Sequence, residues 1–266
     1  MERCPLALDT MYLNRQVRAT YDRVARAPGS GFHFHTGGDY AVQRLGYDAA
    51  ELASLPAVST DRFSGVGNPH RIGTIRAGSV VLDHACGAGM DLLLAARAIG
   101  PQGRAIGVDL TPAMRGCAIR AAAQAGLIDR VMLHEGTFED LPVEDASVDY
   151  VLSNGVLNLA PDKPRVVREI ARVLRPGGEL FLADVVLDRE LAAPVRANAD
   201  LWTACVAGAL TETALPELLR ECGLTQVRIT ERFECFAGTG IDRKFHRHLH
   251  AYGVNVHAVR PIDPSA

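Results

Sequence analysis

Short runs of β-branched and other apolar residues alternate with stretches of helical periodicity through the middle of the chain. The strand-like runs are Val80–Asp83, Ala105–Asp109, Val131–Glu135, Val148–Ser153 and Glu179–Asp184. The helix-like stretches are Met90–Ile99, Pro112–Ala125 and Lys163–Leu174. Strand alternating with helix at this spacing predicts an α/β fold with a parallel sheet covered on both faces.

The flanking regions follow different patterns. Before the alternating region, glycine-rich turns separate helical stretches such as Thr20–Arg26 and Tyr40–Leu55. After it come further helices and two more strand-like runs, Gln226–Phe236 and Asn255–Val259. We therefore expect three parts, with a helical N-terminal part over 1–71, an α/β core over 72–185 and a C-terminal part over 186–266 that completes the sheet.

Composition limits the classes of function. The 266 residues carry a net charge of −3 and a pI near 6.3, so no overall positive field attracts nucleic acid or an anionic membrane. No run predicts a signal peptide or a membrane span. The six cysteines are scattered without a Cys-x-x-Cys pair, which favours reduced thiols in the cytoplasm. We expect a cytoplasmic protein that is either a monomer or a homodimer.

The first strand-like run leads into a glycine turn that suits a ligand. After Asp83 the chain reads His84, Ala85 and Cys86, and then Gly87-Ala88-Gly89 before a helix. Glycine allows a ligand to approach the backbone closely, and the N-terminus of the following helix favours a negatively charged group. Asp109 ends the next strand, where a carboxylate can accept both hydroxyls of a ribose. The pattern predicts a nucleotide-type cofactor site.

Two further segments make this prediction more specific. In Gly136–Pro142, Thr137 and Phe138 are placed to border an adenine, and Arg172–Gly178 reads as a helix end, a turn and a following strand. The glycine turn also lacks the third glycine expected of a dinucleotide site. A nucleotide-binding fold without group transfer remains the alternative at this point, because a fold alone does not determine a function.

The motifs Asp83-x-x-Cys86-Gly87-x-Gly89, Val108–Met114 and Leu174–Gly178 resemble those of class I S-adenosylmethionine-dependent methyltransferases over residues 79–184. The resemblance implies a Rossmann-like sheet of seven strands, whose last strand runs antiparallel to its neighbours. It also implies S-adenosyl-L-methionine as the cofactor, with its methionine carboxylate at the helix N-terminus. Ala85 departs from the pattern, which usually has glycine there. We assign the cofactor site to Tyr21, Asp83, His84, Ala85, Gly87, Gly89, Asp109, Leu110, Met114, Thr137, Phe138, Ser153 and Asn154.

A narrower resemblance, to arsenite methyltransferases, rests on Gly65–Pro69, Gly87–Asp91, Ser153–Leu159 and Cys205–Ala209. Those enzymes bind trivalent arsenic through cysteine thiolates, and here only Cys205 falls at such a position, because Val66 and Gly155 replace the other two. We therefore predict methylation of a small organic acceptor in a roomier, more apolar pocket. The predicted acceptor site comprises Val66, Asn68, Gly155, Asn158, Trp202 and Cys205.

Three residues are candidates for a catalytic role, namely Cys205, His33 and His35. Each has an ordinary alternative: Cys205 as a relict or packing residue, and the two histidines as polar side chains of an ordered loop. No metal site is predicted. Two other functions remain open, a metalloid or thiol methyltransferase that uses Cys205 and a non-catalytic module that binds S-adenosylmethionine.

Overall fold

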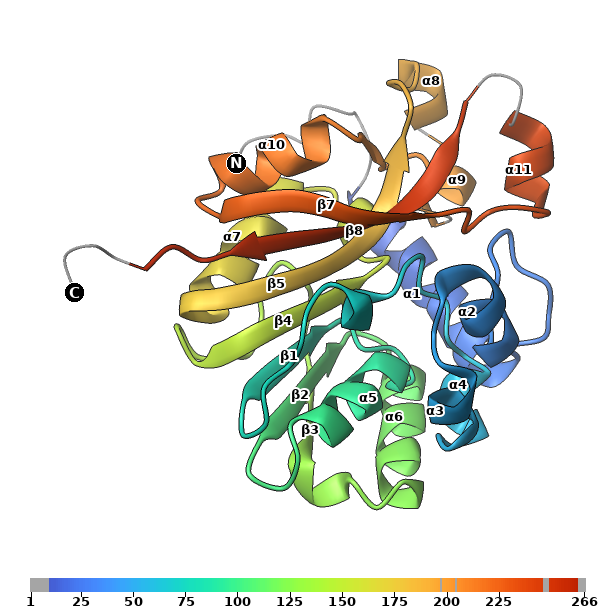
Figure 1. Cartoon of the computed structure of the whole chain (residues 1–266). Coiled ribbons are helices and arrows are strands. Elements are labelled where there is room, and N and C mark those ends of the chain that lie inside the picture. The colour runs from blue at the N-terminus through green and yellow to red at the C-terminus, as the bar shows by residue number, and fades with distance from the viewer. Residues whose placement is uncertain (1–9, 197, 204, 246–248, 263–266) are drawn as a thin grey trace.

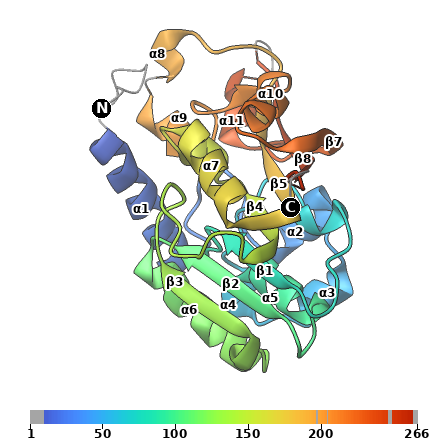
Figure 2. The ribbon, with the colours of Figure 1, turned by 90° about the vertical axis from the view of Figure 1, so that its left-hand side faces the viewer.

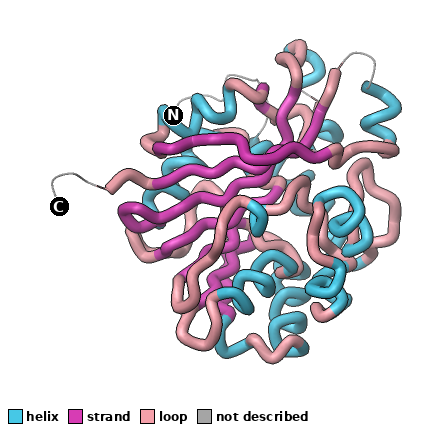
Figure 3. Tube along the Cα trace, in the orientation of Figure 1, coloured by secondary structure: helices cyan, strands magenta, loops and turns pink. Residues whose placement is uncertain are grey.

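The structure is a computed structural model that describes residues 10–196, 198–203, 205–245 and 249–262. A single twisted sheet runs through the molecule, with helices on both of its faces (Figures 1 and 3). Its strands are β1 Val80–His84, β2 Arg104–Asp109, β3 Val131–Glu135, β4 Val148–Asn154, β5 Leu174–Leu187, β6 Leu210–Thr211, β7 Thr225–Phe233 and β8 Ala251–Val259.

The pairing of the strands confirms the predicted sheet, in which the last strand runs antiparallel to its neighbours. Seven strands lie in the order β3-β2-β1-β4-β5-β8-β7, and the short β6 pairs with β5 beside them. β1 to β5 pair in parallel, whereas β8 is antiparallel to both β5 and β7. The predicted run Asn255–Val259 is thus the second half of the antiparallel strand.

The helices form a layer on each face of the sheet. They are α5 Met90–Ala98, α6 Pro112–Gln124, α7 Lys163–Val173, α8 Ala193–Arg196, α9 Ala199–Thr203, α10 Ala214–Glu221 and α11 Gly240–Phe245, with the 3-10 turns η1 Pro69–Arg71, η2 Ile128–Arg130 and η3 Leu157–Leu159. Within the ranges that the structure describes, none of the helices is long and apolar enough to cross a membrane.

Neighbouring residues of one strand lie in different hydrophobic clusters. Val81 packs with Leu92 and Leu93 of α5, whereas Leu82 packs with Val166 and the rest of the α7 face. Successive side chains of a strand point to opposite faces, so burial of both requires helices on both sides. This explains why the strand-like runs are almost continuously apolar, and it confirms the covered parallel sheet.

The N-terminal part consists of α1 Thr10–Arg26, α2 Gly38–Leu45, α3 Ala49–Ala53 and α4 Ala57–Thr60. Helices α1 and α4 pack on α6, and α1 also reaches α9, as Figure 2 shows along one edge of the molecule. The prediction of one helix over Tyr40–Leu55 was wrong. Gly46, with φ 69°, ends α2 in a left-handed conformation, and the Asp48 side chain then caps α3 by accepting the Glu51 N–H.

The strand order reverses between β1 and β4. The chain winds outward from β1 to β3 on one side and from β4 to β5 on the other, so the connections leave a crevice at the carboxyl ends of these strands. Asp83 lies at the end of β1, Asp109 ends β2 and Asn154 ends β4. The predicted cofactor residues are therefore gathered at the point where this fold class binds ligands.

Candidate active site

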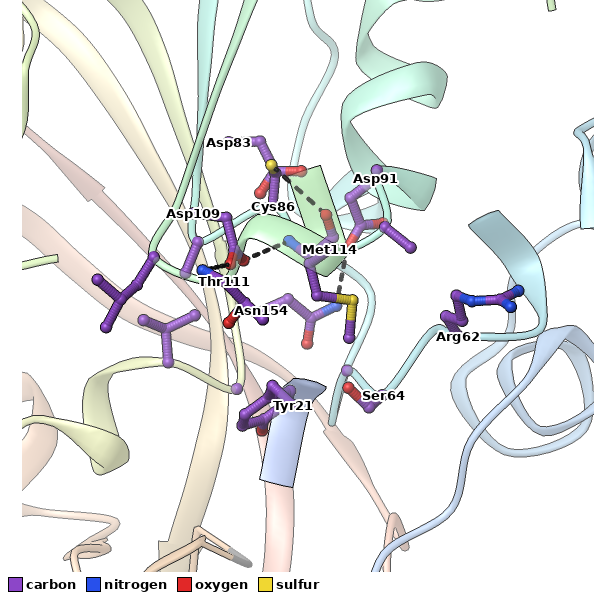
Figure 4. A pocket seen from close by; sticks show the side chains of 18 of the residues that line it. Tyr21, Arg62, Ser64, Asp83, Cys86, Asp91, Asp109, Thr111, Met114 and Asn154 are labelled. Atoms are coloured by element: carbon purple, nitrogen blue, oxygen red, sulfur yellow. Dashed lines mark hydrogen bonds between the residues drawn. The ribbon is translucent and has the colours of Figure 1, made fainter. Parts of the chain in front are cut away.

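A cavity of about 930 Å³, counted with the space open to solvent, lies at the crevice and is closed on one side by the N-terminal helices (Figure 4). The core contributes Asp83, Ala85, Cys86, Gly87, Ala88, Gly89, Met90, Asp91, Val108, Asp109, Leu110, Thr111, Met114, Gly136, Phe138, Asn154, Gly155, Val156 and Leu159. The N-terminal part contributes Val17, Arg18, Tyr21, Ser59, Arg62, Phe63, Ser64 and Gly65.

The glycine turn adopts left-handed backbone conformations. Gly87 has φ 54° and Gly89 has φ 88°, and a β-carbon on Gly89 would lie 3.1 Å from that of Ala118. Ala85 has φ 62°, although it is not a glycine. This is a backbone conformation that glycine adopts without strain. Alanine therefore replaces the usual glycine of the motif, while the turn keeps its conformation.

Asp109 is held rigidly at the tip of β2. Its two carboxylate oxygens accept the Gly87 N–H at 2.9 Å and the Thr111 N–H at 2.7 Å. Burial raises the pKa of Asp109, while these hydrogen bonds act in the opposite direction. Each carboxylate oxygen has a further lone pair, so the pinned group can still accept the hydroxyls of a ribose.

Asp83 is a buried carboxylate that lacks a partner for one oxygen. It is 4% exposed, and within the described ranges Oδ2 has no hydrogen-bond partner. Burial raises the pKa of Asp83 well above its usual value, and the nearby carboxylates of Asp91 and Asp109 raise it further. S-adenosylmethionine carries an ammonium and a sulfonium, so an acidic cavity with an unsatisfied acceptor fits this cofactor.

Asp91 connects the cavity to the N-terminal part. The Tyr47 hydroxyl donates to its Oδ1 at 2.7 Å, the Asn154 Nδ2 donates to its Oδ2 at 3.0 Å, and the His70 Nε2 lies 3.4 Å from Oδ1. Asn154 also accepts the Val66 N–H at 2.8 Å through its own Oδ1. Side chains of the cavity wall therefore fix the position of the segment before η1.

The cavity lining contains ten of the thirteen residues assigned to the cofactor site and leaves out His84, Thr137 and Ser153. The His84 ring lies between the Ser153 hydroxyl and the Phe138 carbonyl, each 3.2 Å away, and burial lowers its pKa to about 4. His84 is thus a neutral ring behind Phe138. Thr137 borders an adjoining shallow hollow that shares Leu110 and Gly136 with the main cavity.

The three positions compared with arsenite methyltransferases meet at one place. A β-carbon built on Gly155 would lie 3.6 Å from both methyl groups of Val66, and the Cys205 thiol donates to the Gly155 carbonyl at 3.5 Å. Of the six residues predicted for the acceptor, only Gly155 is part of the cavity lining. Burial, followed by the Asp184 carboxylate, raises the pKa of Cys205 well above its usual value, so its sulfur is a neutral thiol.

Asn68, Asn158 and Trp202 lie outside the cavity lining. Each forms hydrogen bonds that hold neighbouring segments of the fold together. The Asn68 backbone pairs with the Asn255 amide, at 3.2 Å through its N–H and 2.7 Å through its carbonyl. Asn158 donates to the Asp184 carboxylate at 2.8 Å, and the Trp202 indole donates to the Leu159 carbonyl at 3.0 Å. All three are buried, and their polar groups are used within the fold.

The two histidines proposed for catalysis also lie outside the cavity lining. His33 is exposed, whereas the His35 ring stacks on Tyr40 with centroids 4.9 Å apart and has its Nε2 3.0 Å from the Ala237 carbonyl. His35 therefore connects the loop after α1 to the segment after β7. Within the described part of the chain, no group of three or more His, Cys, Asp or Glu side chains is arranged to hold a metal ion.

Several lining residues from the N-terminal part were not predicted from the sequence, among them Arg18, Ser59, Arg62 and Ser64. Arg18 is on α1 and Ser59 on α4, while the other two follow α4 in a loop without periodicity. Only the packing of these elements against α6 places them over the cavity. Asp91 was visible as part of the glycine motif, but its hydrogen bond to Tyr47 and its contact with His70 depend on the tertiary fold.

Comparisons with known proteins identify the family of the chain. A family model described as "Methyltransferase domain" matches residues 75–223. The arsenite methyltransferase of Halobacterium salinarum is 43% identical over 192 residues, which cover 72% of this chain and 49% of that protein. The arsenic(III) S-adenosylmethionine methyltransferase of Chlamydomonas reinhardtii superposes with a TM-score of 0.72 at 35% identity, over 81% of this chain and 73% of that one.

A more distant structure shares the fold alone. A geranyl diphosphate methyltransferase superposes with a TM-score of 0.64 at 17% identity, over 93% of this chain and 99% of that one. This chain spans about half the length of the curated arsenite methyltransferases that it matches. The family match covers more than half of the chain and includes the turn, Asp109 and Asn154. The chain belongs to the methyltransferase domain family, with the class I fold and S-adenosylmethionine as its cofactor.

Proposed function

We propose that this protein transfers the methyl group of S-adenosylmethionine to a small organic molecule by in-line displacement. The observation that carries the proposal is that Val66, Gly155 and Cys205 meet at one place. Two of these three positions have no sulfur, and methyl groups of Val66 lie 3.6 Å from the β-carbon position of Gly155. Val66 and Cys205 lie outside the lining, so the cavity wall at Gly155 presents no sulfur to a bound acceptor, and this favours an organic molecule.

The state of the remaining sulfur supports an organic acceptor. Trivalent arsenic is a soft metalloid that is held by two or three thiolates, not by a single thiol. Cys205 is 5% exposed, and burial holds its pKa well above the ordinary range. A neutral thiol that donates to the Gly155 carbonyl is a packing group.

The acceptor side of the cavity has a largely apolar surface. Val17, Phe63, Val156 and Leu159 line it together with Tyr21, whose pKa is raised well above its usual value mainly by burial. Tyr21 is therefore a neutral phenol over the cavity. This surface, and a net charge of −3, suit a small molecule and not a nucleic acid.

The residues of the chain contribute mainly by positioning. The cofactor, when bound, supplies an activated methyl group on a sulfonium. Asp109 and Asp83 are placed to hold its ribose and its amino group, while Tyr21 and Phe63 keep water from the reacting atoms. Alignment of two reactants in a closed site lowers the entropic part of the barrier, and no metal is required for it.

Methylation of a metalloid or a thiol is the second candidate function. The 43% identity to the Halobacterium salinarum arsenite methyltransferase favours it. Cys235 is also buried, and it lies close enough to Cys205 to raise the pKa of the latter. A metalloid would then require both sulfurs as thiolates, against the burial that opposes their ionisation.

The test uses S-adenosylmethionine with a labelled methyl group, supplied either with a fractionated metabolite extract or with arsenite and glutathione. We expect a labelled organic product with the wild-type protein and with Cys205→Ser, and none with Asp109→Ala, the control without a cofactor site. Labelled methylarsenicals that disappear in Cys205→Ser would overturn the proposal. The absence of any product above the Asp109→Ala background would favour a binding module.

A variant that adds two cysteines distinguishes the two candidate functions further. The double variant Val66→Cys and Gly155→Cys places two more sulfurs beside Cys205. We expect it to bind arsenite, as measured by calorimetry, where the wild-type protein does not. Equal arsenite binding by both proteins would show that the wild-type chain already holds a thiolate site.

A further inference from the structure

The glycine turn uses most of its own N–H donors. The Cys86 N–H donates to the Val108 carbonyl at 2.8 Å, the Gly87 N–H to Asp109 at 2.9 Å and the Gly89 N–H to the Cys86 carbonyl at 2.9 Å. A turn in this state offers few donors to an anion. The amino-acid carboxylate of S-adenosylmethionine therefore needs a partner outside these three groups.

The N-terminus of α5 is not well suited to this carboxylate either. The Leu92 N–H donates to Asp83, and the buried carboxylate of Asp91 stands in the first turn of the helix. A third carboxylate brought beside these two is repelled, and this repulsion offsets the attraction of the helix dipole. Binding of the methionine carboxylate by the N-terminus of α5 alone is therefore electrostatically unfavourable.

Cations line the opposite side of the cavity. Among the described residues that line the cavity, the basic side chains are those of Arg18 and Arg62. Figure 4 shows Arg62 and Ser64 on one side of the view and Asp109 on the other, with Met114 between them. The cavity is therefore acidic where the core forms it and basic where the N-terminal part covers it.

Arg62 is held in place before any ligand binds. Its Nε donates to the Ala25 carbonyl at the end of α1 at 2.6 Å, and its Nη1 donates to the Val58 carbonyl of α4 at 3.3 Å. Arginine has five N–H donors, so three remain once these two bonds between described residues are counted. Arg18 is exposed on α1 and near Asp22, so its charge is better screened.

We propose that Arg62 is the counter-ion of the amino-acid carboxylate of bound S-adenosylmethionine. The same side chain is bonded to α1 and α4, so the carboxylate of the cofactor fastens both helices over the occupied cavity. A bond between guanidinium and carboxylate is charge-assisted, and it is strengthened by partial burial. The inference concerns the cofactor alone and is independent of the acceptor.

The test compares three ligands that differ at one end. S-adenosylhomocysteine has the ammonium and the carboxylate, its decarboxylated analogue keeps only the ammonium, and 5′-methylthioadenosine has neither. Their dissociation constants are measured by calorimetry for the wild-type protein and for Arg62→Gln, Arg62→Lys, Arg18→Gln and Arg15→Gln. Arg15 is exposed on α1 and does not line the cavity, so it serves as the matched charge control.

We expect Arg62→Gln to weaken binding of S-adenosylhomocysteine by roughly tenfold to a hundredfold, the range of a hydrogen bond to a charged group. Binding of the other two ligands should change little, so the preference for the carboxylate collapses in this variant. Arg62→Lys should restore part of that preference, because it keeps the charge without the planar fork. Arg15→Gln should behave like the wild-type protein.

Two outcomes would overturn the proposal. The first is an equal loss of affinity for all three ligands in Arg62→Gln, which would mean that Arg62 only supports α1 and α4. The second is an unchanged preference in Arg62→Gln, or one that collapses in Arg18→Gln instead. Since the ligands are compared within one variant, a general loss of stability does not imitate the expected pattern.

Discussion

Replacement of Ala85 by glycine tests the strain in the cofactor turn. Ala85 has φ 62°, in the left-handed region that costs a residue other than glycine about 1–2 kcal/mol. Glycine removes this strain but loses about 0.4–1 kcal/mol through the greater freedom of the unfolded chain. The net expectation is a gain of about 0.5–1 kcal/mol in the free energy of unfolding, or about 1–4 °C in Tm.

Gly87→Ala is the reciprocal variant in the same turn. Gly87 has φ 54°, and a β-carbon there has no heavy atom within 4 Å, so the change adds strain without a steric clash. We expect a loss of stability of about the same size, from the same two terms with opposite sign. The added methyl group faces the cavity, so it should also weaken binding of S-adenosylhomocysteine.

The assay is thermal and urea unfolding of the two variants without ligand, followed by calorimetric titration with S-adenosylhomocysteine. The reasoning predicts stability changes of opposite sign and a loss of affinity confined to Gly87→Ala. It would be refuted if Ala85→Gly lowered the Tm, or if both variants shifted it in the same direction. Either result would mean that contacts of the Ala85 methyl group outweigh its backbone strain.

Three further predictions concern buried polar groups. Burial holds the pKa of His84 at about 4 in the folded protein, below the ~6.5 of the unfolded chain, so its contribution to stability is present above pH ~6.5 and is lost as the pH falls toward 4. The stability difference between the wild-type protein and His84→Gln should therefore change by up to about 1.4 kcal/mol per pH unit in this window, and a difference constant with pH would contradict it. Tyr47→Phe removes a donor 2.7 Å from Asp91 and should lower the free energy of unfolding by about 1.5–3 kcal/mol in urea, whereas a loss under about 0.5 kcal/mol would show that this bond adds little. Among the five described cysteines, iodoacetamide should label Cys222 first and leave the buried thiol of Cys205 unreacted until unfolding, as followed by peptide mass spectrometry; early labelling of Cys205 would instead support a reactive thiolate.

The core of the fold was largely predictable because its strands are buried on both faces. Largely apolar runs such as Val148–Ser153, in which Asp149 is the one charged residue, leave little choice of structure, and the observed β4 extends the prediction by one residue. The ends of β5 and β8 were less predictable. β5 begins at Leu174, inside the predicted turn, since strand pairing with β4 continues past an irregularity near Tyr150.

The cofactor site was predictable for a related reason. Glycine and aspartate in Asp83–Gly89 and at Asp109 meet local requirements, a left-handed turn and a carboxylate at a strand end, so sequence spacing reveals them. His84 belongs to the first of these motifs and Ser153 to the segment Ser153–Leu159, but both lie behind the cavity and contact each other at 3.2 Å. Position within a motif does not determine which way a side chain faces.

The sequence by itself determined the α/β fold with its covered parallel sheet, because that depends on periodicity, and its motifs indicated the class of cofactor through their resemblance to a known family. Only the tertiary structure decided which residues enclose the cavity from the N-terminal side. It brought Arg62 to the cavity and Tyr47 and His70 to Asp91 in the cavity wall, and it gathered Val66, Gly155 and Cys205 at one place. These contacts join segments far apart in the chain, and they exist only once helices without a motif have packed against the core.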